Sequence, residues 1–199
     1  MKNLIDLKLL MSEEQSHKLQ ELQKTFALAC DEAAFFVRRS GSWHRVTLHH
    51  LAYKTLRQKF PALGSQMVCN AIYAVSKACK EIFQEPGGQW AIIAKSGRSL
   101  PILKFSNTTP VFFDKHTLTL KKNELSLFTL DGRMKIQVHL SKKIEERLRG
   151  EKLKELYLLR NNNTFHLRFV FREGSDDGAI QIKLSVKVIP EALVGSLAL

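Results

Sequence analysis

The hydrophobic pattern of this chain changes once, near residue 88, and the change limits the folds that the chain can adopt. Before that point apolar residues recur at gaps of three and four, which is typical of helices with one buried face. After it they alternate with polar residues, which is typical of half-buried strands. The 199 residues suffice for one ordinary domain or two small ones, and this order predicts an α+β fold.

A short strand and a long helix are expected at the start of the chain. Residues 4–10 alternate apolar and polar side chains, as a strand does. Ser12 and Gln15 have the spacing of a capping box, in which two side chains satisfy backbone N–H groups at a helix start. Glycine and serine at 40–42 should end this helix. Its buried stripe is Leu19, Leu22, Phe26, Ala29, Ala33 and Val37.

Two further helices are expected before residue 88. The second begins at Thr47 and must end before Pro61, because proline cannot lie inside a helix and disfavours helical geometry in the preceding residue. The third begins at Ser65, and the Pro-Gly-Gly sequence at 86–88 closes it.

Short strands should fill the rest of the chain. They are expected at 90–94, 101–105, 111–114, 117–121, 124–130, 133–140, 156–160, 164–172 and 180–189, and the charged segment 141–154 permits a helix. Asp131-Gly132 predicts a type I′ hairpin turn, and 161–163 predicts a second hairpin. The whole predicts a small barrel or sandwich with a three-helix insertion after the first strand.

This layout gives four predicted parts. We assign residues 1–11 to the first barrel strand, 12–88 to the helical insertion, 89–190 to the barrel and 191–199 to a C-terminal tail.

A large excess of positive charge points to a polyanionic partner. The chain has 31 Lys and Arg against 19 Asp and Glu, a net charge of +12. Residues 1–85 carry +4 and residues 86–199 carry +8, so the anion-binding surface is expected to span the junction of the two parts. Nucleic acid and an anionic membrane surface are the polyanions that such a charge favours.

Other features argue against secretion and against membrane insertion. No apolar run reaches the roughly 20 residues of a membrane-spanning helix, and charges interrupt the start of the chain, unlike a secretory signal. Cys30, Cys69 and Cys79 are odd in number and form no Cys-x-x-Cys pair. We therefore expect small core cysteines, a cytoplasmic location, no membrane partner, no metal and no cofactor.

No catalytic residue is predicted. His44, His49 and His50 lie before or within the second helix, and adjacent helical residues point in different directions. The sequence contains no His-Glu-x-x-His, no phosphate-binding glycine loop and no nucleophile elbow. We interpret the histidines as solvated polar residues.

The candidate binding residues are basic and polar side chains on predicted helix and strand faces. They are Lys54 and Arg57 on the second helix; Ser65, Gln66, Asn70, Tyr73, Lys77 and Lys80 on the third; and Arg98, Lys104, Arg133, Arg160, His166, Arg168 and Arg172 in the strand region. Asn and Gln can form bidentate contacts with adenine, whereas Lys and Arg neutralise phosphate. The alternative for each set is an ordinary solvated face.

Four segments, taken in order, carry a resemblance to a known family. They are Asp6 to Gln15; Phe60 to Met67 with Asn70 to Ile72 and Ala78 to Lys80; Leu103 to Phe105 followed by Thr117 to Leu120; and the hairpin of Leu156 to Arg160 with Phe165 to Leu167. They resemble the N-terminal half of the TnpB/OrfB family of transposon-encoded, RNA-guided endonucleases.

The resemblance implies an oligonucleotide-binding-like wedge barrel with a helical recognition insertion. In the family these modules hold the guide RNA scaffold and recognise a short motif beside the DNA target. Ser65, Gln66, Cys69, Asn70 and Tyr73 would then contact duplex DNA, and the basic barrel face would hold the backbone of structured RNA.

The sequence departs from the family where its RuvC-like nuclease begins. Residues 188–199 contain no aspartate, and the later acidic residues and the zinc ribbon are absent. A two-metal cut needs carboxylates that hold both ions, so we expect a nucleic-acid-binding protein without nuclease activity. Two alternatives stay open: a truncated transposase remnant without retained activity, and a subunit that pairs with a separately encoded nuclease and exposes an apolar patch near 192–199.

Overall fold

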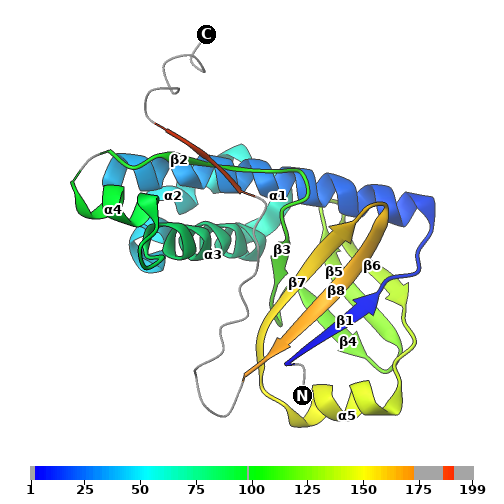
Figure 1. The fold of residues 1–199 in the computed structure, drawn as a ribbon. Helices are drawn as coiled ribbons and strands as arrows, with labels where there is room; N and C mark the ends of the chain where they lie inside the picture. The colour runs from blue at the N-terminus through cyan, green and yellow to red at the C-terminus, as the bar shows by residue number, and fades with distance from the viewer. Residues whose placement is uncertain (1–2, 98, 173–185, 191–199) are drawn as a thin grey trace. The chain divides into compact units, whose positions relative to one another are not determined.

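The computed structural model describes residues 3–97, 99–172 and 186–190 and confirms the predicted α+β class (Figure 1). The helices are α1 (Glu13–Ser40), α2 (Arg45–Lys59), α3 (Gly64–Phe83), α4 (Gln89–Lys95) and α5 (Lys142–Gly150), with a 3₁₀ turn, η1, at Pro61–Leu63. The strands are β1 (Leu4–Lys8), β2 (Ile102–Phe105), β3 (Val111–Phe113), β4 (Leu118–Lys121), β5 (Glu124–Thr129), β6 (Gly132–Gln137), β7 (Leu153–Asn161), β8 (Thr164–Phe171) and β9 (Val186–Ile189).

The chain forms two compact units. Unit 1 contains residues 1–23 and 110–183, and unit 2 contains residues 24–109 and 184–199. The predicted barrel segment 89–190 is therefore divided, because β2 and β9 belong to the unit that holds most of the helices.

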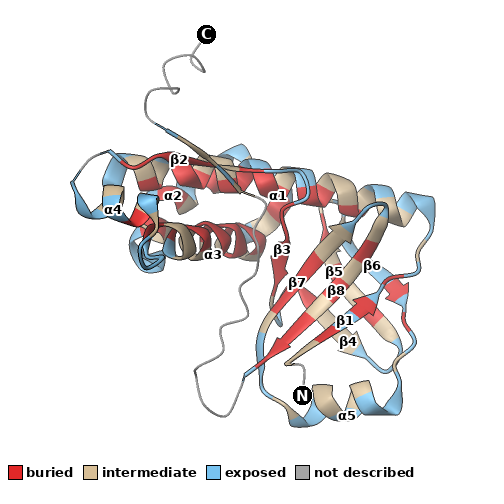
Figure 2. Ribbon diagram, viewed as in Figure 1, coloured by how far each residue is buried: buried red, intermediate tan, exposed pale blue. Residues whose placement is uncertain are grey.

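Unit 1 is built from two antiparallel sheets, ordered β1-β8-β7-β3 and β4-β5-β6. The pairing register lines up Leu7, Leu167, Leu158 and Val111 across the four-stranded sheet, and all four are buried (Figure 2). Leu120 of β4 and Phe169 of β8 line one cavity, so the two sheets face each other. Neither sheet closes into a barrel in the part of the chain that the structure describes.

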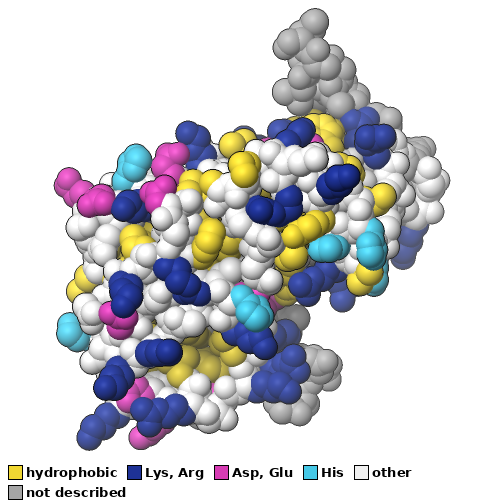
Figure 3. Space-filling model, turned by 180° about the vertical axis from the view of Figure 1, so that it is seen from behind, with side chains coloured by type: hydrophobic (Ala, Val, Ile, Leu, Met, Phe, Trp, Pro, Cys, Tyr) yellow, Lys and Arg dark blue, Asp and Glu magenta, His cyan; other side chains and the backbone are white. Residues whose placement is uncertain are grey.

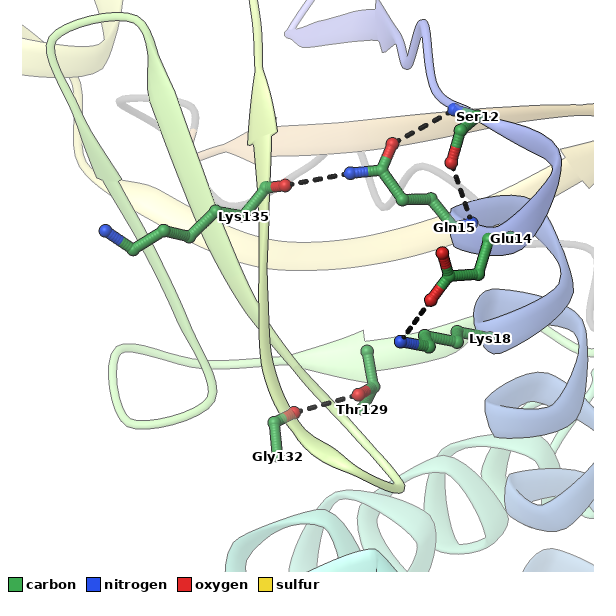
Figure 4. A network of polar contacts seen from close by, with 7 residues as sticks. All are labelled: Ser12, Glu14, Gln15, Lys18, Thr129, Gly132 and Lys135. Atoms are coloured by element: carbon green, nitrogen blue, oxygen red, sulfur yellow. Dashed lines mark hydrogen bonds and ion pairs between the residues drawn. The ribbon is translucent and has the colours of Figure 1, made fainter.

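The predicted capping box at the start of α1 is confirmed (Figure 4). The Ser12 N–H donates to Gln15 Oε1 at 3.0 Å, and the Gln15 N–H donates to Ser12 Oγ at 3.2 Å. The Gln15 Nε2 group also donates to the Lys135 carbonyl at 3.0 Å. One side chain therefore both caps the helix and attaches its first turn to β6.

Unit 2 consists mainly of packed helices. The α2 and α3 helices form a hairpin joined by η1, where Gly64 adopts a φ of +68°, a backbone conformation that favours glycine. Asp31 of α1 attaches the β2–β9 pair, because its carboxylate accepts the Phe105 N–H at 2.7 Å and the Lys104 ammonium at 3.1 Å.

Two local predictions are wrong. Residues 90–94 lie in the helix α4 and not in a strand, because a short apolar run has no period that separates a buried strand from a helix turn. The Asp131-Gly132 turn is not type I′, which needs a positive φ at both central residues. Thr129 pairs with Gly132, so the two central residues of the turn are Leu130 and Asp131, and neither has a positive φ. The positive φ, +107°, belongs to Gly132, the first residue of β6.

Other boundaries shift slightly or fall outside the structure. The second helix begins at Arg45, two residues before the predicted Thr47, with His44 at its N-cap in an extended conformation. Of the predicted strand 180–189, residues 180–185 lie outside the described residues, as does the tail 191–199 with its expected apolar patch.

No helix in the described ranges has the length and apolar character needed to cross a bilayer.

Leu167→Ala should destabilise unit 1 by about 2–5 kcal/mol, because its side chain is fully buried on the central strand β8. Urea unfolding followed by far-ultraviolet circular dichroism measures the loss. The matched control is Leu10→Ala, at a side chain that is 67% exposed, which should change stability by less than about 0.5 kcal/mol. Equal losses for the two variants would contradict the assigned core.

Candidate nucleic-acid interface

The predicted binding residues of α3 are unevenly accessible. Ser65 and Lys80 are exposed, and Gln66 and Tyr73 are half-buried. Lys77 is half-buried too, and it forms an ion pair with Glu81 at 3.6 Å. The start of this helix therefore presents polar groups to solvent, whereas its middle is largely covered.

Asn70 does not belong to the exposed face that the sequence predicts. Its side chain is only 6% exposed and donates to Met67 Sδ at 3.9 Å. Half of the twenty residues of α3 are buried, so its apolar contact surface is wider than a single stripe. Because the buried surface of α3 is this wide, it includes Asn70. The side-chain amide of Asn70 therefore cannot reach a base edge unless the helix packing rearranges.

Arg168, the central basic residue of the predicted strand face, is held by a carboxylate. Its Nε and a terminal nitrogen donate to the two Asp6 oxygens at 2.5 and 2.6 Å, across directly paired positions of β1 and β8. The Asp6 carboxylate raises the pKa of Arg168 above its ordinary value. Burial raises the pKa of the neighbouring Tyr157, an effect that the Arg168 guanidinium partly opposes. The charge of Arg168 is thus balanced within unit 1.

The other predicted basic residues of unit 1 lie on different faces. Arg160 is paired with buried Phe165 in the register, with its guanidinium 6.0 Å from the ring centroid. Arg133 belongs to the three-stranded sheet and donates to the His116 carbonyl at 2.7 Å. His166 is half-buried and Arg172 is exposed. The structure does not gather these side chains on one face of β7 and β8.

Two predicted residues of the strand region belong to unit 2 by their position in the chain. Lys104 lies on β2 and is paired with Asp31. Arg98 lies outside the described residues.

The strongest charge feature is a long segment without acidic residues, which the sequence reasoning above did not use. Residues 33–80, here called the acid-free segment, contain eight Lys or Arg, three His and no Asp or Glu. They comprise the end of α1, all of α2 and η1, and most of α3. Scanning each sign of charge separately along the chain would have found it, whereas net charges over two halves concealed it.

The two units divide the charge in the opposite way to the two halves of the sequence. Unit 2 has 13 basic and 5 acidic residues, a net +8, and unit 1 has 18 and 14, a net +4. Most of the difference comes from Lys95, Arg98 and Lys104, which lie in the second half of the sequence but belong to unit 2, and residues 1–23, which carry a net charge of −1, belong to unit 1.

The α2 helix displays this charge because its apolar side is already occupied. Leu48, Ala52 and Leu56 are fully buried, which holds the opposite side toward solvent. Lys54 on that side is exposed and has no ion pair or hydrogen bond within the described part of the chain. Arg57, one turn further on, donates to the Pro61 carbonyl at 3.3 Å and has no carboxylate partner among the same residues. In Figure 3, blue and cyan side chains lie together in the region of the helices, with few magenta ones among them.

Aromatic rings accompany the cations of α2. His49 and Tyr53 stack at a centroid distance of 4.7 Å and an interplanar angle of 23°. The Arg45 guanidinium lies 5.1 Å from the ring centroid of Tyr73, which joins the start of α2 to α3. His44 and His50 are exposed, as predicted for solvated histidines, and His49 is half-buried.

In the described ranges, side chains that could bind a metal ion do not cluster. Among the described residues no three His, Cys, Asp or Glu side chains lie close enough together to hold a metal ion.

Cys30 and Cys79 are buried, as predicted for small core residues, and burial raises the pKa of both thiols.

Comparison with known proteins gives no relative for this chain. A scan against protein-family models finds no match, and a search of curated proteins finds none either.

The cysteines should differ in reactivity. At pH 8 the folded protein should release one equivalent of thionitrobenzoate quickly from Ellman's reagent, from half-buried Cys69, because burial keeps Cys30 and Cys79 protonated and inaccessible. After denaturation all three thiols should react. Three equally fast thiols in the folded protein would show that the buried positions are wrongly assigned.

Proposed function

We infer that the chain binds nucleic acid through the acid-free segment and does not cut it. The observation that carries this proposal is the solvent-facing side of α2, where exposed Lys54 and half-buried Arg57 have no carboxylate partner among the described residues. When unpaired Lys and Arg side chains neutralise phosphates, they release the counterions condensed on the nucleic acid, and this release is a main source of affinity for polynucleotides.

The surroundings of these cations favour a polynucleotide over a membrane surface. A helix that lies in a bilayer interface needs a free apolar face, whereas the main apolar stripe of α2 is buried inside unit 2 and only Val46 and Leu51 are exposed large apolar side chains on this helix. Aromatic and imidazole rings beside the cations offer stacking partners to unpaired bases, which suits a single-stranded or looped RNA. Ser65 and Gln66 lie at the start of α3, after the turn that follows α2, and are polar groups that could contact base edges.

The resemblance to the N-terminal half of TnpB/OrfB proteins supports the same proposal. Under it, unit 1 is an open oligonucleotide-binding-like barrel made of the four-stranded and three-stranded sheets, and the helices of unit 2 are the recognition insertion. Structured RNA is the first ligand, and duplex DNA carrying a short target motif is the second. The exposed residues Arg133 and Arg172 would add phosphate contacts from unit 1.

Removing two cations from α2 should weaken binding and flatten its salt dependence. Fluorescence anisotropy of a labelled RNA stem-loop and of a labelled DNA duplex, measured from 50 to 300 mM KCl, gives the slope of log K against log salt. If about five phosphates are neutralised, the slope is near −4, and Lys54→Ala with Arg57→Ala should reduce its magnitude by about 1.4–1.8.

A matched control separates this surface from the general charge of the molecule. Lys142→Ala with Lys143→Ala removes the same charge from exposed positions of α5 in unit 1 and should leave the slope unchanged. Equal effects of the two double variants, or a flat salt response of the unmodified protein, would contradict the proposal. Vesicles of phosphatidylserine should compete with RNA only weakly, and strong competition would favour a membrane surface instead.

Binding without cleavage is expected. Incubation of the complexes with 5 mM Mg²⁺ or Mn²⁺ should leave RNA, single-stranded DNA and duplex DNA intact on denaturing gels. Cleavage that follows the protein through successive chromatography steps would contradict the nuclease-free proposal without contradicting RNA binding.

A further inference from the structure

A second candidate site is formed entirely by residues of unit 1. A cavity of about 260 Å³ is walled by apolar side chains from both sheets and from α5. Its apolar wall consists of Leu120, Leu140, Leu148, Leu153, Phe169 and Phe171. Side chains of this kind, gathered in a concave space, are typical of small-molecule sites.

The α5 helix covers this wall incompletely. No residue of α5 is buried, and Leu148 is half-buried against the cavity. Leu153, at the irregular start of β7, is 41% exposed although it lines the same space. Apolar surface therefore stays in contact with water, and an apolar ligand would remove it from water.

A contact between Arg147 and Phe171 attaches the C-terminal end of α5 to β8. Arg147 forms a two-pronged ion pair with Glu151, at 2.5 and 2.8 Å, and its guanidinium lies 4.7 Å from the ring centroid of Phe171. Ser141 accepts the Ile144 N–H and caps the other end. The two local contacts stabilise the helix, and the Arg147–Phe171 contact attaches its C-terminal end to β8, beside a cavity that the side chains of the helix do not fill.

The rim of the cavity is basic. Lys122 lies in the tight turn between β4 and β5 with a φ of +53°, and it has no ion pair or hydrogen bond within the described ranges. Arg149 has a side chain that is 83% exposed, and it reaches Glu145, the acidic residue of the rim, only at 3.6 Å. Two cations against one loosely paired carboxylate leave the rim positive.

We propose that this cavity binds a small amphiphilic anion, a medium-chain aliphatic carboxylate, with its tail against the apolar wall and its carboxylate between Lys122 and Arg149. An apolar cavity of about 150 Å³ admits one benzene ring, so a cavity of about 260 Å³ suits a tail of roughly ten carbons. Charge complementarity at the rim selects an anion over a neutral or cationic amphiphile.

Isothermal titration calorimetry of the full chain with potassium decanoate, below its micelle-forming concentration, tests the proposal. Decanoate should bind at one site, and decyltrimethylammonium should not. From hexanoate to octanoate to decanoate, each added methylene should tighten binding about twofold to fourfold. Equal binding of the anionic and cationic probes, or no dependence on chain length, would overturn it.

Variants place the ligand in the cavity. Leu148→Trp should fill the space and abolish decanoate binding, and Lys122→Glu should weaken it at least tenfold. Lys143→Glu, on the same helix but outside the cavity lining, is the matched control and should change binding less than twofold. Circular dichroism verifies that each variant is folded. Binding that survives Leu148→Trp would overturn the assignment.

A vesicle arm distinguishes a free carboxylate from a membrane lipid. Binding to phosphatidylserine vesicles without any binding of monomeric decanoate would overturn the proposal in favour of a membrane surface. The RNA affinity of Leu148→Trp should equal that of the unmodified protein, so this site and the acid-free segment can fail independently.

Discussion

The pairing of β1 with β8 is the constraint on which unit 1 depends. It joins residues 4–8 to residues 166–170, so most of the chain must be in place before this edge of the sheet can form. Asp6 and Arg168 sit opposite each other in that register, and their ion pair favours it over a one-residue slip. The capped start of α1 follows directly and is attached to β6 by Gln15.

The division into units also explains how the charge of the molecule is distributed. In unit 1 several basic side chains contact carboxylates or backbone carbonyls of the same unit, as Arg168 and Arg133 do. In unit 2, Asp31, Glu32 and Glu81 are committed to Lys104, Lys59 and Lys77. Lys54 and Arg57 of α2 have no carboxylate partner among the described residues, so a polyanion is the natural counterion for these two cations.

The two proposed sites rest on different physics. The surface of α2 carries unpaired positive charge at Lys54 and Arg57, and its affinity would come from counterion release, which salt weakens. The cavity beside α5 is concave and apolar with a positive rim, and its affinity would come mainly from apolar burial, which salt does not weaken. The two sites belong to different units of the chain.

By itself the sequence determined the α+β class, the ends of the long helices and most strands, because hydrophobic period, Pro61 and the Ser12–Gln15 capping box act over a few residues. It could not separate helix from strand at 90–94, since a short apolar run has no measurable period. It also could not show that Asn70 is buried and so removed from the candidate interface, or that the charge of Arg168 is balanced by Asp6. Burial of Asn70 depends on how many helices surround α3, and the partner of Arg168 lies 162 residues away. Only tertiary packing decides which charges meet, because strand pairing joins residues whose separation along the chain has no local signal.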